Sequence, residues 1–245
     1  MPDHDPDAAP QPTAPFEERK AGKPHAHGHR QRLRERFLRD FGASMADYEL
    51  LELLLTLALP RRDVKPIAKE LIARFGSFAC VVSADPVVLE SVKDVKSSTV
   101  TALKLVQAAA QRLAQQQVMN AHVLSSWDKL IDYCRIAMAH EKVEQVRLLF
   151  LDHKNRLIAD EVQQRGTVNH TPLYPREVMK RALELNASAL ILVHNHPSGD
   201  PTPSGDDIQM TYDIRDAAKK LGITLHDHLI ISKGDHTSFK SSGLL

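Results

Sequence analysis

The sequence predicts an α/β protein in which a small all-α domain precedes a domain of strands and helices. Apolar residues recur at helical spacing between residues 29 and 117. From residue 118 onward, apolar runs of strand length are interspersed with helical segments. The first 28 residues instead combine proline with acidic and small residues, a composition that buries too little apolar surface to fold. We therefore expect a disordered tail over residues 1–28, an all-α domain over 29–117 and an α/β domain over 118–245.

The all-α domain is expected to be a bundle of short helices joined by brief loops. Pro60 and Gly76 each follow an apolar stretch, where proline ends a helix and glycine caps one. Asp85 precedes Pro86, an arrangement that favours the start of a helix. The expected helices cover residues 33–41, 48–59, 64–75, 86–92 and 100–113.

The α/β domain begins with two expected strands joined by a short polar turn, after which helices separate the strands. Residues 189–193 form a continuous apolar run, which is typical of a buried strand. Asn186 and Gly222 each follow a helical stretch and are typical residues of helix C-termini. The expected strands cover residues 146–151, 156–168, 189–193, 223–232 and 237–240, and the expected helices cover 175–185 and 206–221.

Charge and cysteine content narrow the classes of protein to consider. The 245 residues carry 32 Lys and Arg against 31 Asp and Glu, a formal net charge of +1, so any nucleic-acid surface must be local. Cys80 and Cys134 stand far apart, which argues against a disulfide framework and against a metal held by thiolates. The apolar runs are shorter than a bilayer span, and the amino terminus does not resemble a signal peptide. We therefore expect a cytoplasmic protein with no membrane partner.

The stretch VHNHPSGDPTPSGDD, residues 193–207, lies between an expected buried strand and an expected helix. Side chains two residues apart on a strand point to the same face, so His194 and His196 can address one point in space. The intervening loop reverses the chain, and Asp207 then returns to that point in the first turn of the helix. Three such ligands leave the fourth position of a zinc ion open for water, as in catalytic sites. We expect one Zn²⁺ per chain, held by His194, His196 and Asp207.

A catalytic zinc site also needs a group that accepts and returns protons. Zinc lowers the pKa of a bound water to ~7, which produces a hydroxide that attacks carbonyl carbon. The acid/base must come from another strand, and Glu144, at the entry to the strand 146–151, is the best candidate, with Glu141 as the second choice. The Ser204 hydroxyl can donate to the developing oxyanion. Ser204 and Asp207 also match a helix capping box, and capping and metal ligation can coexist.

These residues resemble a known metalloprotease motif. His194-x-His196-Pro197 followed by Ser204-x-x-Asp207, with a glutamate on an upstream strand, resembles the JAMM (MPN+) motif at every position. More narrowly, residues 29–245 look like the bacterial RadC family. The segments that carry this resemblance are GHRQRLRERFL, DYELLELLL, PRRDVKPIAKEL, RFGSF, LFLDHKNRLIADE, RGTVNHTPLYPREV, HNHPSGDPTPSGDD and DHLIIS. The resemblance implies a JAMM fold of the cytidine deaminase-like type, with a central mixed sheet flanked by helices. It also implies zinc at the two histidines and Asp207, a Glu144 acid/base and a Ser204 oxyanion donor.

Two functions follow from the resemblance and stay open at this point. The first is a RadC-like zinc-dependent metallohydrolase that cleaves an amide or isopeptide bond in a protein or peptide. The second is a DNA-associated accessory protein of DNA repair or recombination, in which the metal domain is structural or recruits partners. In RadC-like proteins the helical half looks like a helix-hairpin-helix domain, whose Gly-containing hairpin offers backbone amides to phosphate.

The helical half departs from the RadC pattern at this hairpin. Asp94-Val95-Lys96 stands where the family usually shows Gly-Val-Gly. We expect the tight turn that glycine permits to be missing, and the Asp94 carboxylate to repel phosphate. DNA therefore stays a possible partner of the helical half rather than an expected one, and no pattern indicates the oligomeric state. Asp227 and His228 start a late strand, where a second metal or a proton shuttle is conceivable, but we favour a buried role that supports the site.

Overall fold

The computed structural model describes residues 24–119, 121–165 and 173–245. The described residues divide into two compact units, one that ends at Met45 and one that begins at Ala46. The first described helix, α1, spans Pro24–Asp40, so most of the tail expected over residues 1–28 lies outside the described residues. The second unit contains the later helices and the sheet.

Helices α2 to α7 precede the sheet in the sequence. They span Asp47–Ala58 (α2), Lys65–Phe75 (α3), Phe78–Ser83 (α4), Pro86–Glu90 (α5), Ser97–Val118 (α6) and Trp127–Met138 (α7), with a short 3₁₀ turn at Val123–Ser125. The sequence did not predict α4 or α7. Helix α4 has six residues, which is too short to display a helical period, whereas α7 buries Leu130, Cys134 and Met138 at a spacing that does indicate a helix. None of the helices in the described part of the chain is long and apolar enough to span a membrane.

The turn between α5 and α6 forms without glycine. Asp94 adopts a φ of 68°, in the left-handed region that Asp occupies more readily than most residues. Its carboxylate forms an ion pair with Arg62, which offsets the negative charge. The expectation that this turn would be missing was therefore wrong, because a side chain of the Asn or Asp type also tolerates this backbone conformation. The presence of the turn does not test DNA binding, and DNA stays a possible partner of the helical half.

Within the described residues, five strands form one mixed sheet with the order β2-β1-β3-β4-β5. The strands span Gln145–Leu151 (β1), Leu157–Arg165 (β2), Ala189–Asn195 (β3), Thr224–Ile231 (β4) and His236–Ser238 (β5). Strands β3 and β4 are parallel, and the other neighbours are antiparallel. Helices α8 (Pro175–Glu184) and α9 (Gly205–Lys220) are inserted on either side of β3 in the sequence. The α/β class and the mixed sheet that the resemblance implied are both confirmed.

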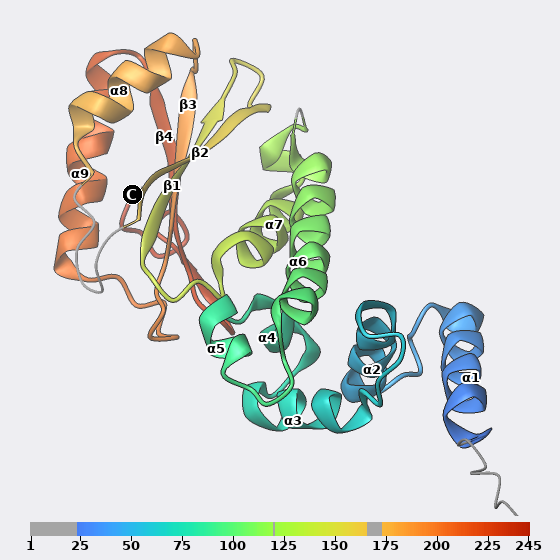
Figure 1. Ribbon diagram of the computed structural model, residues 1–245. Coiled ribbons are helices and arrows are strands. Elements are labelled where there is room, and N and C mark those ends of the chain that lie inside the picture. The colour runs from blue at the N-terminus through green and yellow to red at the C-terminus, as the bar shows by residue number, and fades with distance from the viewer. Residues whose placement is uncertain (1–23, 120, 166–172) are drawn as a thin grey trace, which may run out of the picture. The chain divides into compact units, whose positions relative to one another are not determined.

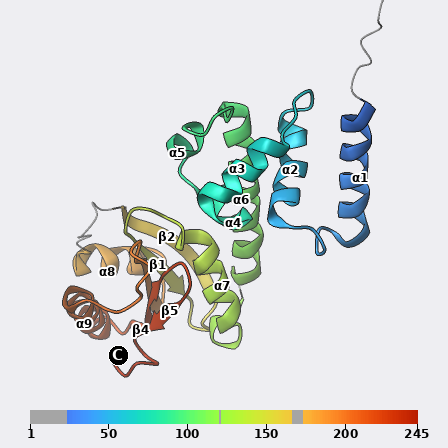
Figure 2. The ribbon, with the colours of Figure 1, turned by 90° about the horizontal axis from the view of Figure 1, so that it is seen from below.

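The sheet separates two apolar cores. Leu149, Ile191 and Leu229 face one side, where α7 packs against them. Leu148 and Leu192 face the other side, where α8 and α9 cover the sheet. Figure 1 shows α8 and α9 on one face and α7 on the other, and the perpendicular view in Figure 2 agrees. Side chains alternate across a strand. On β1 and β3, even-numbered residues therefore face α8 and α9, and odd-numbered residues face α7.

The ends of α8 and α9 follow the sequence expectations. Asn186 has a φ of 52° and Gly222 a φ of 70°, the left-handed conformation that terminates a helix. Both residues lie just before a strand, so each turn redirects the chain from a covering helix into the sheet. These turns fix where β3 and β4 begin, and hence which residues lie at the end of β3.

Candidate metal centre

The end of β3 delivers two histidines to the face that α9 covers. Leu190 and Leu192 face the core beneath α8 and α9, and His194 continues the same face two residues later. His194 is fully buried, whereas His196, just beyond the strand, is partly exposed. The buried strand therefore places one enclosed imidazole, that of His194, next to one accessible imidazole, that of His196.

A capping box at the start of α9 orients Asp207. The Ser204 hydroxyl oxygen accepts a hydrogen bond from the Asp207 N–H at 3.1 Å, and the Ser204 N–H donates to Asp207 Oδ2 at 2.8 Å. The Ser204 hydroxyl also donates to Asp207 Oδ2 at 2.6 Å. These bonds satisfy the free amides of the helix start and hold the carboxylate against the two histidines.

Strand β1 brings in the glutamate. It runs antiparallel to β3 with Val146 opposite His194, and Glu144 lies two residues before Val146, so it points to the same face. Glu144 Oε1 lies 4.0 Å from His194 Nε2. Glu141, the alternative acid/base, instead lines a polar cavity together with Gln145 and residues of α6. The structure therefore brings Glu144, and not Glu141, to the histidines.

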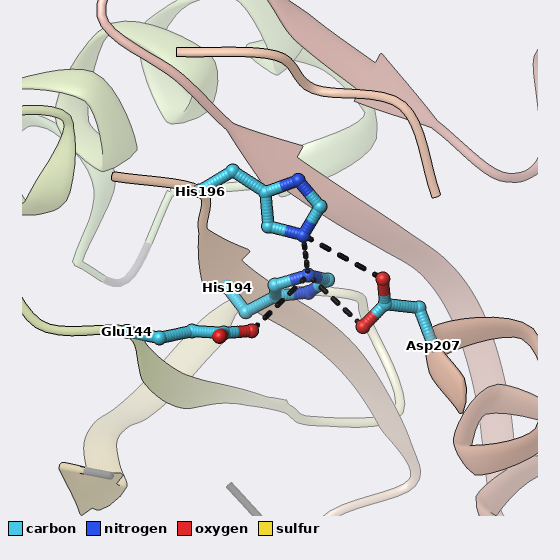
Figure 3. Close-up of side chains that lie close together, drawn as sticks. All are labelled: Glu144, His194, His196 and Asp207. Carbon is cyan, nitrogen blue, oxygen red and sulfur yellow. Dashed lines mark hydrogen bonds and ion pairs between the residues drawn. The ribbon is translucent and has the colours of Figure 1, made fainter. Parts of the chain in front are cut away.

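Four donor groups converge on one point, as Figure 3 shows. One ligand atom from each of Glu144, His194, His196 and Asp207 lies within 4.8 Å of the others. His194 Nε2 lies 2.9 Å from His196 Nε2 and 3.2 Å from Asp207 Oδ1, and His196 Nε2 lies 3.5 Å from Asp207 Oδ2. Ligand atoms ~2.0–2.2 Å from a tetrahedral zinc ion lie ~3.3–3.6 Å from one another. The two nitrogens and the Asp207 carboxylate therefore fit a single metal ion with modest adjustment.

The imidazole nitrogens that face away from this point are also hydrogen-bonded. His196 Nδ1 lies 2.8 Å from the backbone carbonyl of Asp200. A carbonyl only accepts, so Nδ1 of a neutral His196 carries the proton and its Nε2 presents a lone pair to the cluster. His194 Nδ1 lies 2.7 Å from Nε2 of the fully buried His228. Partners of this kind orient ligand histidines in metal sites.

The charges of the cluster suit a cation. Burial on its own would raise the pKa of the Asp207 carboxyl, but the adjacent imidazoles of His194 and His196 lower that pKa well below its usual range. The hydrogen bond to Asp207 in turn raises the pKa of His196. Burial, together with the neighbouring His194, lowers the pKa of His228 well below its usual value. The cluster thus combines an ionised carboxylate with imidazoles, the donor set of a zinc or related divalent site.

Asn195 supports the glutamate from the opposite face of the sheet. Its Oδ1 accepts from the Gln145 N–H at 3.0 Å, and its Nδ2 donates to the carbonyls of Val143 at 3.3 Å and Glu141 at 3.4 Å. These bonds fix the segment on which Glu144 lies. This role was not predicted from the sequence, although the alternation of a strand already places the side chain of Asn195 opposite those of the two histidines.

Asp227 and His228 have different roles although they are adjacent. Asp227 accepts from the Ser238 hydroxyl at 2.5 Å and from the Lys240 N–H at 2.9 Å, which ties β4 to the end of β5. His228 contacts the donor cluster through His194, whose Nδ1 lies 2.7 Å from His228 Nε2. Within the described residues, the cluster around His194 is the one group of His, Cys, Asp and Glu donors close enough to share a metal ion. Neither residue therefore builds a second metal site there.

Comparison with known proteins agrees with this fold. The family model of the RadC-like JAB domain matches residues 124–244. The α/β half of this chain is accordingly a JAB domain, a class associated with metal-dependent hydrolases.

Full-length relatives identify the family more narrowly. A UPF0758 protein of Rhodobacter capsulatus is 62% identical over 213 residues, which cover 87% of this chain and 100% of the relative. A UPF0758 protein of Ruegeria pomeroyi is 58% identical over 217 residues, which cover 89% of this chain and 97% of the relative. The chain belongs to the UPF0758 family, and the similarity includes most of the helical half.

Proposed function

We propose that this protein is a zinc-dependent hydrolase of the JAMM type that cleaves an amide or isopeptide bond in a protein or peptide. The observation that supports this proposal most directly is the convergence of His194, His196 and Asp207 beside the carboxylate of Glu144. A zinc hydrolase needs three protein ligands for the metal and a nearby group that acts as acid and base. Zinc, when bound, supplies Lewis acidity that polarises the substrate carbonyl and activates water.

The proton transfers fall to Glu144. Its side chain is 18% exposed, whereas that of His194 is fully buried, so the glutamate is open to a substrate at the edge of the cluster. Its carboxylate accepts a proton from the attacking water and returns it to the leaving amine. The hydrogen bonds of Asn195 to the neighbouring backbone keep this carboxylate in place during both transfers.

Ser204 serves the site in two ways under this proposal. In the resting structure its hydroxyl donates to Asp207 Oδ2 and so orients the ligand. Ser204 is exposed, and rotation about its Cα–Cβ bond directs the hydroxyl towards a substrate oxygen. The oxyanion role that the family resemblance implies therefore requires this rotation when substrate binds.

The acid/base assignment is tested by comparing Glu144→Gln with Glu141→Gln. The substrate is first found by screening peptide and isopeptide-linked substrates with the zinc-loaded native protein. Glu144→Gln is expected to lower kcat by about 10²–10⁴-fold while zinc stays bound, because the amide cannot carry the proton. Glu141→Gln is the matched control, since that side chain lines the cavity against α6, and it is expected to keep native activity. A fully active Glu144→Gln protein would assign the proton transfers to another group.

A further inference from the structure

A chain of buried hydrogen bonds connects the cluster to the first turns of α9. His194 Nδ1 lies 2.7 Å from His228 Nε2, and His228 Nδ1 lies 2.6 Å from Thr211 Oγ1. Thr211 Oγ1 donates to the backbone carbonyl of Asp207 at 2.6 Å. The side chains of His194, Thr211 and His228 are fully buried. The chain thus begins at one cluster residue, His194, and ends at the backbone of another, Asp207.

The carbonyl of Asp207 fixes the direction of every bond in this chain. Because a carbonyl only accepts, the single hydroxyl proton of Thr211 points to it. Thr211 can then only accept from His228, so the proton of a neutral His228 lies on Nδ1 and its Nε2 carries a lone pair. That lone pair accepts the Nδ1 proton of His194. His194 Nε2 is left with its lone pair facing the cluster, which is the tautomer that binds a metal ion.

The orientation of the His228 ring is fixed by packing as well. Its ring stacks on Phe239, with the centroids 4.5 Å apart and the planes 26° apart. On β4, His228 lies opposite Leu192 of the parallel strand β3, which places its ring beside that of His194. A ring held on one side by an aromatic face and at both nitrogens by hydrogen bonds cannot turn without losing all three contacts.

We infer that His228 and Thr211 are positioning residues that fix the tautomer and orientation of His194 and thereby raise the affinity of the cluster for zinc. This inference rests on the proposed zinc site and adds residues that touch neither the metal nor the substrate. Partners of this kind typically contribute about 10–100-fold to metal affinity. Here the start of α9 provides both a ligand, the Asp207 carboxylate, and the anchor of the positioning chain, the Asp207 carbonyl.

The test compares zinc affinity, measured by competition with a chromophoric chelator, among variants of the full chain. His228→Leu removes the acceptor and is expected to weaken zinc binding about 10–100-fold. His228→Gln keeps an acceptor oxygen for the His194 Nδ1 proton and is expected to bind zinc within a few-fold of the native protein. Thr211→Val preserves the shape of the side chain but removes the hydroxyl. Like His228→Leu, it is expected to weaken zinc binding.

A double-variant cycle separates positioning from a general structural effect. Glutamine has no tautomers, so Thr211→Val is expected to lower zinc affinity in the native background but not in the His228→Gln background. The Co²⁺-loaded proteins provide a second readout, because the visible spectrum of the His228→Leu protein is expected to change and that of His228→Gln to stay native-like. If His228→Leu does not fold, the cycle between Thr211→Val and His228→Gln still shows whether Thr211 acts through the tautomer of His228.

The outcomes distinguish this inference from the proposed function. Native protein that binds no zinc would overturn both. Native protein that binds zinc, with His228→Leu or Thr211→Val binding it equally well, would overturn the positioning role and leave the zinc site intact. An equal loss for Thr211→Val in both backgrounds would assign its effect to packing rather than to the tautomer of His228.

Discussion

At the scale of single residues, side chains on both faces of the end of β3 contribute to the candidate centre. His194 and His196 point to the cluster, and Asn195 between them points to the opposite face and holds the backbone around Glu144. One tripeptide therefore provides two candidate ligands and the support of the candidate acid/base. Changes at Asn195 should consequently affect Glu144 without removing a metal ligand.

We predict that Asn195→Ala retains zinc but loosens the segment before β1. The change leaves the Gln145 N–H without its acceptor in a buried position, which costs about 1–3 kcal/mol of unfolding free energy. Hydrogen exchange of the Gln145 amide is expected to accelerate, and kcat on an identified substrate is expected to fall while the zinc content stays native. Loss of zinc from Asn195→Ala, with unchanged exchange at Gln145, would contradict this account.

Some site residues could be predicted from the sequence and others could not, for a physical reason. His194, His196 and Asp207 could be grouped because strand alternation and a helix start place them locally. Glu144 was preferred to Glu141 for its position at a strand entry, and in the structure its Oε1 lies 4.0 Å from His194 Nε2. The contacts of His228 and Thr211 could not be predicted, because they depend on the register between β3 and β4, which no local pattern determines.

At the scale of elements, an ion pair joins the edge strand β2 to the covering helix α8. Arg181 binds Glu161 through its Nε, 3.0 Å and 2.9 Å from the two carboxylate oxygens, and its Nη2 lies 2.6 Å from Oε1. The hydrogen bond from Arg181 lowers the pKa of Glu161 below its ordinary value of 4.5. Both side chains are partly exposed, so solvent screening keeps the contribution of the pair to stability small.

The lowered pKa of Glu161 predicts a pH-dependent contribution to stability. A carboxyl group whose pKa is lower in the folded than in the unfolded state stabilises the fold above the unfolded value and loses this effect as the pH falls through the folded value. Thermal unfolding of Glu161→Gln is therefore expected to show a slightly lower Tm than the native protein at pH 7. The two should converge below pH 4.5 as Glu161 is protonated. A difference that persists unchanged after the pH has fallen through both the unfolded and the folded pKa of Glu161 would rule out the ion pair as its cause.

Most elements could be predicted because their ends carry clear signals. Asn186 and Gly222 end α8 and α9 in the left-handed conformation, as expected from the residue types. The turn at Asp94 was misjudged, because an Asp in the left-handed conformation replaces glycine there and Arg62 pairs with it. This pairing joins residues far apart in the sequence, so no local pattern could reveal it.

At the scale of the whole molecule, the candidate centre exists only when separate parts of the chain come together. Glu144 precedes β1, His194 ends β3 and Asp207 begins α9, so the donors lie up to 63 residues apart in sequence, from 144 to 207. An unfolded chain cannot hold them at one point, so the proposed metal binding would be coupled to folding of the JAB domain. The alternation of strands and helices predicted the class of this domain, whereas strand order had to come from the structure.

The most direct test of the account is the zinc content of the purified protein, measured by elemental mass spectrometry after zinc loading and removal of free metal. The native chain is expected to hold about one zinc ion, and His196→Ala combined with Asp207→Ala is expected to hold almost none. His153→Ala combined with Asp213→Ala is the matched control, because it removes the same residue types from exposed positions outside the cluster and should keep its zinc. A native chain without zinc, or a ligand variant that retains it, would contradict the proposed metal centre.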